Sequence, residues 1–219
     1  MKILVTGSEG SLMQFVIPLL LQKGYEVIGV DNFARYGVIE RKRDYKFIRG
    51  DLTNPEFVDE VMAGVDGVIQ AAALIYGVGG FNKYPADILS KDVVLHQNIL
   101  WSMLKHKVKK IAYISSSMVY ERCQKHPSKE EDAMESLIPM TDYGLSKLVG
   151  ERLCMSFQKQ YGIDYVIWRP FNINSTGSCR KRTRYESCVR RLYKKLSYRE
   201  KKPTPYNWNR RTNKMFYLD

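Results

Sequence analysis

The chain has 219 residues, of which 44% are hydrophobic and 12% aromatic, so it can bury one sizeable core. Its longest apolar run, Phe15 to Leu21, contains a proline and is far too short to span a bilayer. Its net charge of +12 is almost confined to residues 175–219, where 14 lysines and arginines face 3 acids, which argues against a nucleic-acid-binding surface spread over the protein.

The first 31 residues are predicted to form a strand, a glycine turn, a helix and a second strand. Lys2–Val5 is a short aliphatic run, typical of a strand buried on both faces. From Ser11 to Lys23 apolar residues recur every three or four positions, which indicates a helix packed on a sheet. Glu26–Val30 is the second strand, and Asp31 stands at its carboxyl end.

This order of elements is typical of dinucleotide binding. Gly7 and Gly10 let the backbone approach a pyrophosphate, and the amino end of the following helix attracts phosphates. Asp31 is placed to bind the adenosine ribose and to repel a 2′-phosphate, which favours NAD over NADP, although Arg35 close behind would soften that preference. The alternative is a strand–helix–strand unit without a cofactor, because a short glycine motif is weak by itself.

Strands and helices continue to alternate up to residue 169. Strands are predicted at Tyr45–Arg49, Gly67–Gln70, Lys110–Ser115 and Tyr165–Arg169, and helices at Asn54 to Met62, Pro85–His106 and Asp142–Tyr161. The glycine-rich segment Leu74–Phe81 and the polar segment Glu121–Asp132 are expected to be loops. This alternation implies right-handed crossovers and a doubly wound parallel α/β sheet, the Rossmann fold. Ala71 to Ala73 either leave room beside a cofactor or simply pack in the core, and their spacing alone favours neither interpretation.

The sequence begins directly with a strand and shows no signal peptide, which predicts a cytoplasmic protein. Its four cysteines form no Cys-x-x-Cys pair, and its three histidines lack the spacing of metal ligands. Scattered thiols in a cytoplasmic chain are more often structural than bridged. We therefore expect neither disulfide bonds nor a metal site.

Two later segments carry residues suited to a redox reaction on an alcohol. Ser116 follows the fifth strand, and Tyr143 and Lys147 lie one turn apart on the last long helix, so their side chains share a face. A neighbouring ammonium stabilises a phenolate, so we expect Lys147 to lower the pKa of Tyr143 from its usual value of about 10. Ser116 would hydrogen-bond the same substrate hydroxyl. The alternative is an ordinary surface pair such as Tyr198 and Lys202, but that pair does not follow a strand ending in serines.

Taken together, these segments resemble the extended short-chain dehydrogenase/reductases that act on nucleotide sugars, the NAD-dependent epimerase/dehydratase family. The likeness covers about residues 1–174 and rests on VTGSEGSLM, GVDNF, GDLTN, AAA, YISSSMVYE, YGLSKLVGE and RPFN, all in the family's order. It implies an enzyme with an NAD-binding Rossmann domain over residues 1–174. It also implies a nucleotide-sugar substrate and a homodimer formed through the two long helices.

The resemblance further implies a role for each residue that matches a family motif. Ser116, Tyr143 and Lys147 would form the catalytic triad, and the last two would also contact the cofactor. The other NAD-binding residues would be Gly7, Gly10, Ser11 and Leu12 at the pyrophosphate, Asp31 and Asn32 at the ribose, Asp51 and Leu52 at the adenine, and Ala71, Ala72, Ala73 and Pro170 along the cofactor. Ser117 and Asn172 would face the substrate.

Three departures from the family pattern narrow the expected reaction. Met13 replaces the third glycine, which puts the close packing of helix on strand in question. Family members that remove water across C4 and C6 carry acids where this chain has Ser117 and Met118. Members that epimerise C3 and C5 use a cysteine where Met118 stands, and a thioether cannot transfer protons. A 4-epimerase cycle remains, in which hydride leaves sugar C4 for NAD and returns on the other face.

Residues 175–219 are expected to be a truncated or divergent remnant of the substrate domain. In the family that lobe is much longer than the 45 residues that follow Asn174 here, so the expected C-terminal substrate lobe is incomplete. An alternative function is an NAD-binding module with little catalysis, whose basic tail binds a polyanion or a partner protein. We expect neither a membrane nor a nucleic-acid partner for the enzyme.

Overall fold

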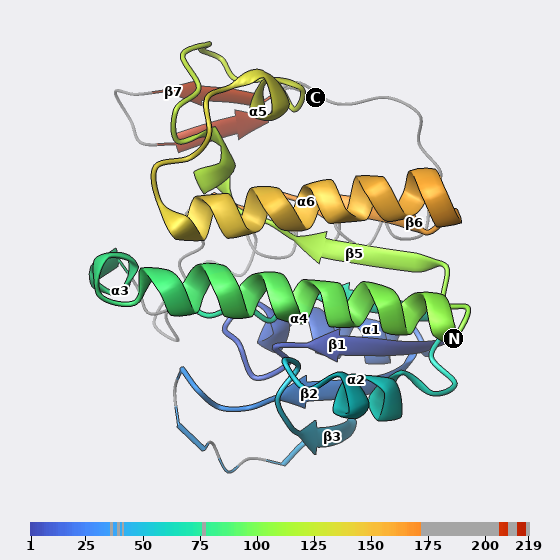
Figure 1. Cartoon of the computed structure of the whole chain (residues 1–219). Helices are drawn as coiled ribbons and strands as arrows, with labels where there is room; N and C mark the ends of the chain where they lie inside the picture. The colour runs from blue at the N-terminus through green and yellow to red at the C-terminus, as the bar shows by residue number, and fades with distance from the viewer. Residues whose placement is uncertain are drawn as a thin grey trace.

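The computed structural model describes residues 1–35, 37–38, 40, 42–75 and 78–171, and the backbone of residues 206–209 and 214–217. Strands and helices alternate along the chain (Figure 1). The strands are β1 (Lys2–Thr6), β2 (Glu26–Asp31), β3 (Lys46–Arg49), β4 (Gly67–Gln70), β5 (Lys110–Ile114), β6 (Asp164–Trp168), β7 (Tyr206–Asn209) and β8 (Lys214–Tyr217). The helices are α1 (Met13–Gln22), α2 (Pro55–Met62), α3 (Val78–Lys83), α4 (Pro85–Lys105), α5 (Asp132–Glu135), α6 (Asp142–Tyr161) and the 3-10 helix η1 (Ser117–Tyr120). Every predicted strand and helix is present, with ends that shift by at most two residues.

Strands β1 to β6 form one parallel sheet in the order β3-β2-β1-β4-β5-β6. On one side of β1, Lys2 lies opposite Glu26 of β2, and on the other side Ile3 lies opposite Gly67 of β4. The chain therefore winds outward from β1 in both directions, which confirms the predicted doubly wound Rossmann fold. Sheets of this kind bind ligands in the crevice outside the carboxyl ends of the strands, where the strand order reverses.

Helices cover both faces of this sheet. On one face α2, α4 and α6 contribute Val58, Ile99 and Phe157 to a buried cluster with the strands. On the opposite face α1 contributes Val16 and Ile17 to a second cluster, and Figure 1 shows α1 behind the sheet and α4 and α6 in front of it. Because strand residues are buried on both sides, the strands read as continuous aliphatic runs.

A short helix, α3, lies in the glycine-rich segment that we predicted to be a loop. Gly79 and Gly80 fall inside it, and a glycine in a helix interior costs about 1 kcal/mol relative to alanine, so the sequence favoured a loop. The ring of Phe81 stacks on the ring of Tyr143 of α6, with centroids 4.9 Å apart and planes at 10°. This tertiary contact offsets the poor intrinsic propensity and fixes α3 beside α6.

In the C-terminal tail the structure describes two strands that the sequence did not predict. β7 and β8 pair antiparallel, from Tyr206 opposite Tyr217 to Asn209 opposite Lys214. The predicted boundary at residues 174 and 175 lies outside the described residues. Across the described ranges, no helix combines the length and the apolar character needed to cross a bilayer. The cytoplasmic location stays a prediction from the sequence.

Gly150 of α6 allows the closest approach between helix and sheet. A Cβ added there would overlap the Tyr113 hydroxyl of β5 and come within 3.0 Å of the His96 ring on α4. We therefore expect Gly150→Ala to lower the free energy of unfolding by about 2 kcal/mol, because the packed core leaves little room for adjustment. Urea unfolding followed by circular dichroism measures this loss. Ser156→Ala, an exposed substitution on the same helix, should stay within about 0.5 kcal/mol, and equal effects of the two changes would contradict the packing argument.

Candidate active site

Three polar side chains meet at the amino end of α6. Thr141 caps the helix by accepting a hydrogen bond from the Gly144 N–H at 3.1 Å, which places Tyr143 in the first turn. Ser116, just beyond β5, is close enough to Tyr143 for its hydroxyl to act to lower the pKa of that phenol. Lys147 lies one turn further along, with its Nζ 5.9 Å from the centre of the Tyr143 ring. The fold thus brings the three predicted catalytic residues together.

The ammonium of Lys147 is held inside the protein. The residue is 2% exposed, and its Nζ donates a hydrogen bond to the Ile114 carbonyl at the end of β5, 3.0 Å away. Burial lowers the pKa of Lys147, whereas the carboxylates of Asp92 and Glu151 act to raise it. The position of this positive charge is therefore set by the backbone of β5 and by two buried acids.

The pKa of the Tyr143 phenol is higher than we predicted. Burial raises its pKa above the ordinary value, and Asp92 adds to the increase, while the Ser116 hydroxyl and the charge of Arg35 act to lower it. The predicted lowering of the Tyr143 pKa by Lys147 is therefore wrong. The physical reason is that desolvation of the buried phenol outweighs the nearby cations, and that Lys147 donates to Ile114.

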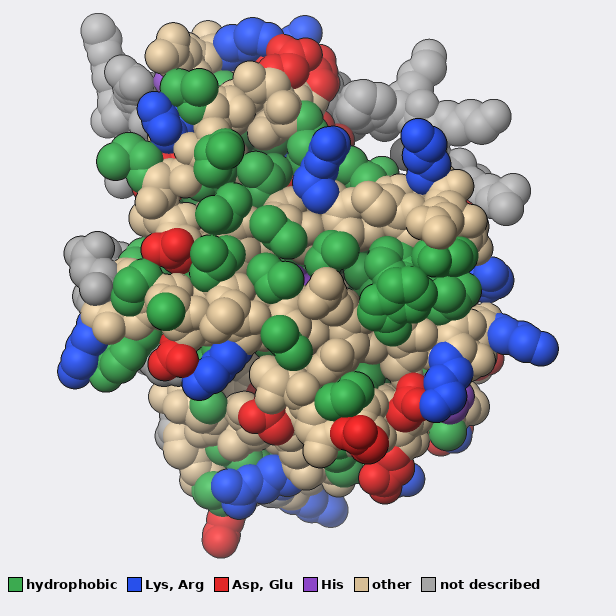
Figure 2. All heavy atoms as spheres, viewed as in Figure 1, with side chains coloured by type: hydrophobic (Ala, Val, Ile, Leu, Met, Phe, Trp, Pro, Cys, Tyr) green, Lys and Arg blue, Asp and Glu red, His purple; other side chains and the backbone are tan. Residues whose placement is uncertain are grey.

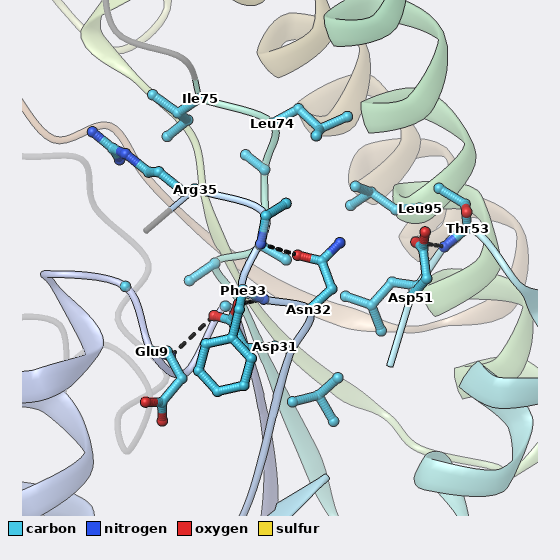
Figure 3. A pocket seen from close by; sticks show the side chains of 18 of the residues that line it. Glu9, Asp31, Asn32, Phe33, Arg35, Asp51, Thr53, Leu74, Ile75 and Leu95 are labelled. Atoms are coloured by element: carbon cyan, nitrogen blue, oxygen red, sulfur yellow. Dashed lines mark hydrogen bonds between the residues drawn. The ribbon is translucent and has the colours of Figure 1, made fainter. Parts of the chain in front are cut away.

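A cavity of about 350 Å³ opens at the carboxyl ends of β1, β2 and β4, where the strand order reverses (Figure 3). Gly7 forms its floor with φ of 64°, and a Cβ there would come within 2.9 Å of the Ala72 backbone, so only glycine fits. The lining includes Gly7, Glu9, Gly10, Asp31, Asn32, Phe33, Arg35, Asp51, Leu52, Ala71, Ala72, Ala73, Leu74 and Ile75. The cavity thus collects residues from five separate segments of the chain, including Lys91 and Leu95 of α4.

Acidic and amide side chains on the cavity wall are oriented by backbone N–H groups. The carboxylate of Asp31 accepts hydrogen bonds from the N–H of Phe33 at 2.8 Å and from the N–H of Glu9 at 3.1 Å. In the same way Asn32 accepts from the N–H of Ala34 at 2.9 Å (Figure 3). These groups are therefore fixed before any ligand arrives.

Cavity and triad lie next to each other. Arg35 lines the cavity and also acts electrostatically on Tyr143. Leu74, another lining residue, donates its N–H to Asp92 at 2.7 Å, and Asp92 in turn accepts a hydrogen bond from Ser146 of α6 at 3.2 Å. The cavity and the amino end of α6 are thus connected through Arg35 and through the hydrogen bonds of Asp92.

A model of the NAD-dependent epimerase/dehydratase family matches residues 3–218 of the chain. The chain belongs to this family. The UDP-glucose 4-epimerase of Halalkalibacterium halodurans is 33% identical over 174 residues, which cover 78% of this chain and 51% of the relative. The GDP-L-fucose synthase of Escherichia coli is 32% identical over 111 residues, which cover 50% of this chain and 35% of the relative.

Solved structures agree with this membership of the epimerase/dehydratase family. The UDP-glucose 4-epimerase from Brucella ovis in complex with NAD superposes with a TM-score of 0.70 at 28% identity, covering 78% of this chain and 52% of that chain. The chain spans about half the length, or less, of the curated relatives that it matches. Members of this family are NAD-dependent enzymes.

The residues of this epimerase/dehydratase family member fit a dinucleotide at the reversal of strand order. Gly7 leaves a cradle that a Cβ would fill, and Leu12, the N-cap of α1, offers no side-chain hydrogen bond to the first turn of the helix. Asp31 offers a carboxylate from the end of β2. Met13 lies in the core with 1% exposed and packs against β1 and α1, so the expected loosening of helix on strand is not observed.

The predicted cofactor residues separate into two groups. Most line the cavity: Gly7, Gly10, Asp31, Asn32, Asp51, Leu52, Ala71, Ala72 and Ala73. Ser11 and Leu12 lie at the start of α1, where Leu12 packs against the core cluster beneath that helix. Pro170 accepts a hydrogen bond from the N–H of Ser117 at 3.1 Å, which joins the ends of β5 and β6 at the triad. Asn172, the other predicted substrate residue, lies outside the described residues.

Two buried acids of the site were missed in the sequence. Asp92 is fully buried, and Ile88, Asp92 and Leu95 follow the spacing of the buried face of α4, so an acid on that stripe was the available signal. Glu151, also fully buried, accepts hydrogen bonds from Arg169 at 2.8 and 2.6 Å. Its partner is remote in sequence, so no local pattern indicated the pair.

Proposed function

We propose that this chain is the catalytic and cofactor-binding part of an NAD-dependent nucleotide-sugar 4-epimerase. One observation carries the proposal: the buried phenol of Tyr143 lies beside Ser116 and Lys147, and Arg35, which lines a cavity suited to a dinucleotide, acts on the same phenol. Over 78% of the chain, the relative named UDP-glucose 4-epimerase is 33% identical and a GDP-L-fucose synthase is 26% identical, and this difference supports the 4-epimerase reaction.

The side chains of the triad divide the proton chemistry of the reaction. The phenolic oxygen of Tyr143 takes the proton of the sugar C4 hydroxyl, and Ser116 holds the same hydroxyl by a hydrogen bond. When bound, NAD would supply the hydride chemistry at C4. The positive charge of Arg35 favours the phenolate against the effect of burial. The same phenol returns the proton after the sugar has turned over.

Residues that would hold the cofactor come from the cavity wall. Gly7 and Gly10 admit a diphosphate to the backbone, and the amino end of α1 attracts its charge. Asp31 would accept hydrogen bonds from the adenosine ribose, and Asp51 and Leu52 would lie at the adenine. Beyond Ser116 the chain offers Ser117 and Met118, and neither is an acid, which argues against a dehydratase.

An assay of the unmodified chain tests the proposed function. UDP-galactose or UDP-glucose is supplied with NAD, and the other sugar nucleotide is measured by chromatography together with nicotinamide absorbance. The 4-epimerase predicts interconversion. If NADH binds to the chain but no sugar nucleotide is converted, the alternative of an NAD-binding module with little catalysis is correct instead.

We also infer that the chain pairs with a second copy through α4 and α6, as the sequence predicted. Figure 2 shows hydrophobic side chains gathered over these two helices. Trp101 of α4 is 51% exposed, and its ring contacts Phe157 and Tyr161 of α6, with centroids 5.0 and 5.8 Å apart. An exposed aromatic cluster on two long helices suits a self-complementary interface.

A single charge should break this interface. We expect Trp101→Glu to convert a dimer into a monomer, because an unpaired carboxylate would be buried at its centre. Light scattering coupled to gel filtration measures the mass. Phe15→Glu is the matched control, since Phe15 is 42% exposed on α1, which covers the other face of the sheet. A monomeric unmodified chain would contradict the inference.

A further inference from the structure

Glu9 is an acid in the glycine turn between β1 and α1. Its side chain is 2% exposed, and the residue lines the cavity beside Asp31 (Figure 3). The Glu9 N–H donates a hydrogen bond to the Asp31 carboxylate at 3.1 Å, so the two acidic residues are neighbours on the wall. In a bound dinucleotide the adenosine ribose would lie at Asp31, next to Glu9.

The Glu9 carboxylate is held by two residues of the segment before β3. Arg43 donates from Nε to Oε1 at 3.1 Å and from Nη2 to Oε2 at 3.0 Å, which is a bidentate pair. The Tyr45 hydroxyl donates to Oε1 at 2.7 Å. Arg43 also lies over the Phe47 ring, with its guanidinium carbon 4.4 Å from the centroid. The guanidinium is thus fixed beside the cavity wall.

Gly29 of β2 leaves the space that Tyr45 needs to reach Glu9. A Cβ on Gly29 would overlap the Tyr45 ring, so glycine at this position lets Tyr45 pass beneath the turn and reach Glu9. Glu9 and Arg43 are 34 residues apart in sequence and are joined only by the fold. The pair therefore ties the segment that carries Asn32, Phe33 and Arg35 to the glycine turn.

The charges at this wall bear on the choice between the two nicotinamide cofactors. NADP differs from NAD by a 2′-phosphate on the adenosine ribose, and proteins that accept it usually place an arginine there. In this chain Arg43 lies beside the lining residue Glu9, and its guanidinium is bound by that carboxylate. We propose that Glu9 is a specificity-determining residue that makes the chain select NAD over NADP, by adding a second acid at the ribose and by holding Arg43 on its own carboxylate.

This inference rests on the proposed function, in which the cavity holds a dinucleotide. Binding measurements distinguish a failure of this inference from a failure of the proposed function. The dissociation constants of NADH and NADPH are obtained with the full chain from nicotinamide fluorescence. We expect Glu9→Gln to tighten NADPH binding about tenfold relative to NADH, since one nearby negative charge is removed. Adding Arg43→Met to Glu9→Gln should cancel that gain. Glu26→Gln, which removes a charge from the far end of β2, should leave the ratio unchanged.

Arg43→Met alone keeps the inference testable if Glu9→Gln fails to fold. This substitution leaves the negative charge of Glu9 without its bidentate partner. We therefore expect NADPH binding to weaken about threefold or more relative to NADH binding. A ratio that stays constant in folded Glu9→Gln, or in folded Arg43→Met where the first variant does not fold, overturns the inference and leaves the proposed function intact. If the unmodified chain binds neither cofactor, both are overturned.

Discussion

Tyr143→Phe should lower the rate of sugar-nucleotide interconversion by about a thousandfold, the scale of a lost general acid–base group. The substitution removes only the phenolic oxygen, which is the atom that takes the substrate proton in the proposed reaction. The ring stays, and its stack on Phe81 stays with it, so the fold around α3 and α6 is retained. NADH binding should persist, because the cavity residues are unchanged.

The rate is measured with saturating NAD and with UDP-galactose, and NADH binding is measured by fluorescence on the same preparation. Tyr25→Phe is the control, because it removes the same atom from the end of β2 opposite the site. Interconversion at an unchanged rate in Tyr143→Phe would show that another group moves the proton. The pKa of Tyr143 is raised, mainly by burial, so its phenol remains protonated at pH values where a free tyrosine has begun to ionise.

Glu151→Ala should lower the free energy of unfolding by about 3–5 kcal/mol, the usual cost of removing one partner from a buried ion pair. Glu151 is fully buried and accepts a hydrogen bond from the Ser115 hydroxyl at 2.5 Å as well as two from Arg169. Arg169 also donates to the Tyr120 hydroxyl at 2.5 Å and to the Glu130 carbonyl at 2.8 Å. Burial acts to lower the pKa of Arg169, but the hydrogen bonds with Glu151 and its negative charge outweigh burial. The pKa of Arg169 is therefore raised. Without Glu151, a buried guanidinium loses its counter-charge.

Urea unfolding measures this effect against Glu26→Gln. Glu26 forms an ion pair of 3.0 Å with Lys2, but its side chain is 63% exposed, so its loss should cost less than about 1 kcal/mol. The double variant Glu151→Leu with Arg169→Met should recover most of the stability, because apolar residues can replace a buried pair. If Glu151→Ala were no more destabilising than Glu26→Gln, the pair would not support the ends of β5 and β6.

Local sequence patterns were sufficient for most of the fold. Hydrophobic periodicity and capping residues predicted the six strands of the sheet and the bounds of α6, because those signals depend on residues within one or two turns. The motif spacing also predicted that Ser116, Tyr143 and Lys147 meet, since Tyr143 and Lys147 share one helix and Ser116 follows a strand of the same sheet. Most of the predicted cofactor residues line one cavity for the same reason, because parallel strands end at one edge.

By itself the sequence determined the strand and helix order, the glycine turn and the positions of the triad. Only the tertiary structure decided the sign of the Tyr143 pKa shift, the helix at Val78–Lys83, the burial of Met13 in the core and the pair of Glu9 with Arg43. Each of these depends on which remote groups share a desolvated space. Burial and charge pairing act through distances in three dimensions, and a linear pattern carries no direct record of them.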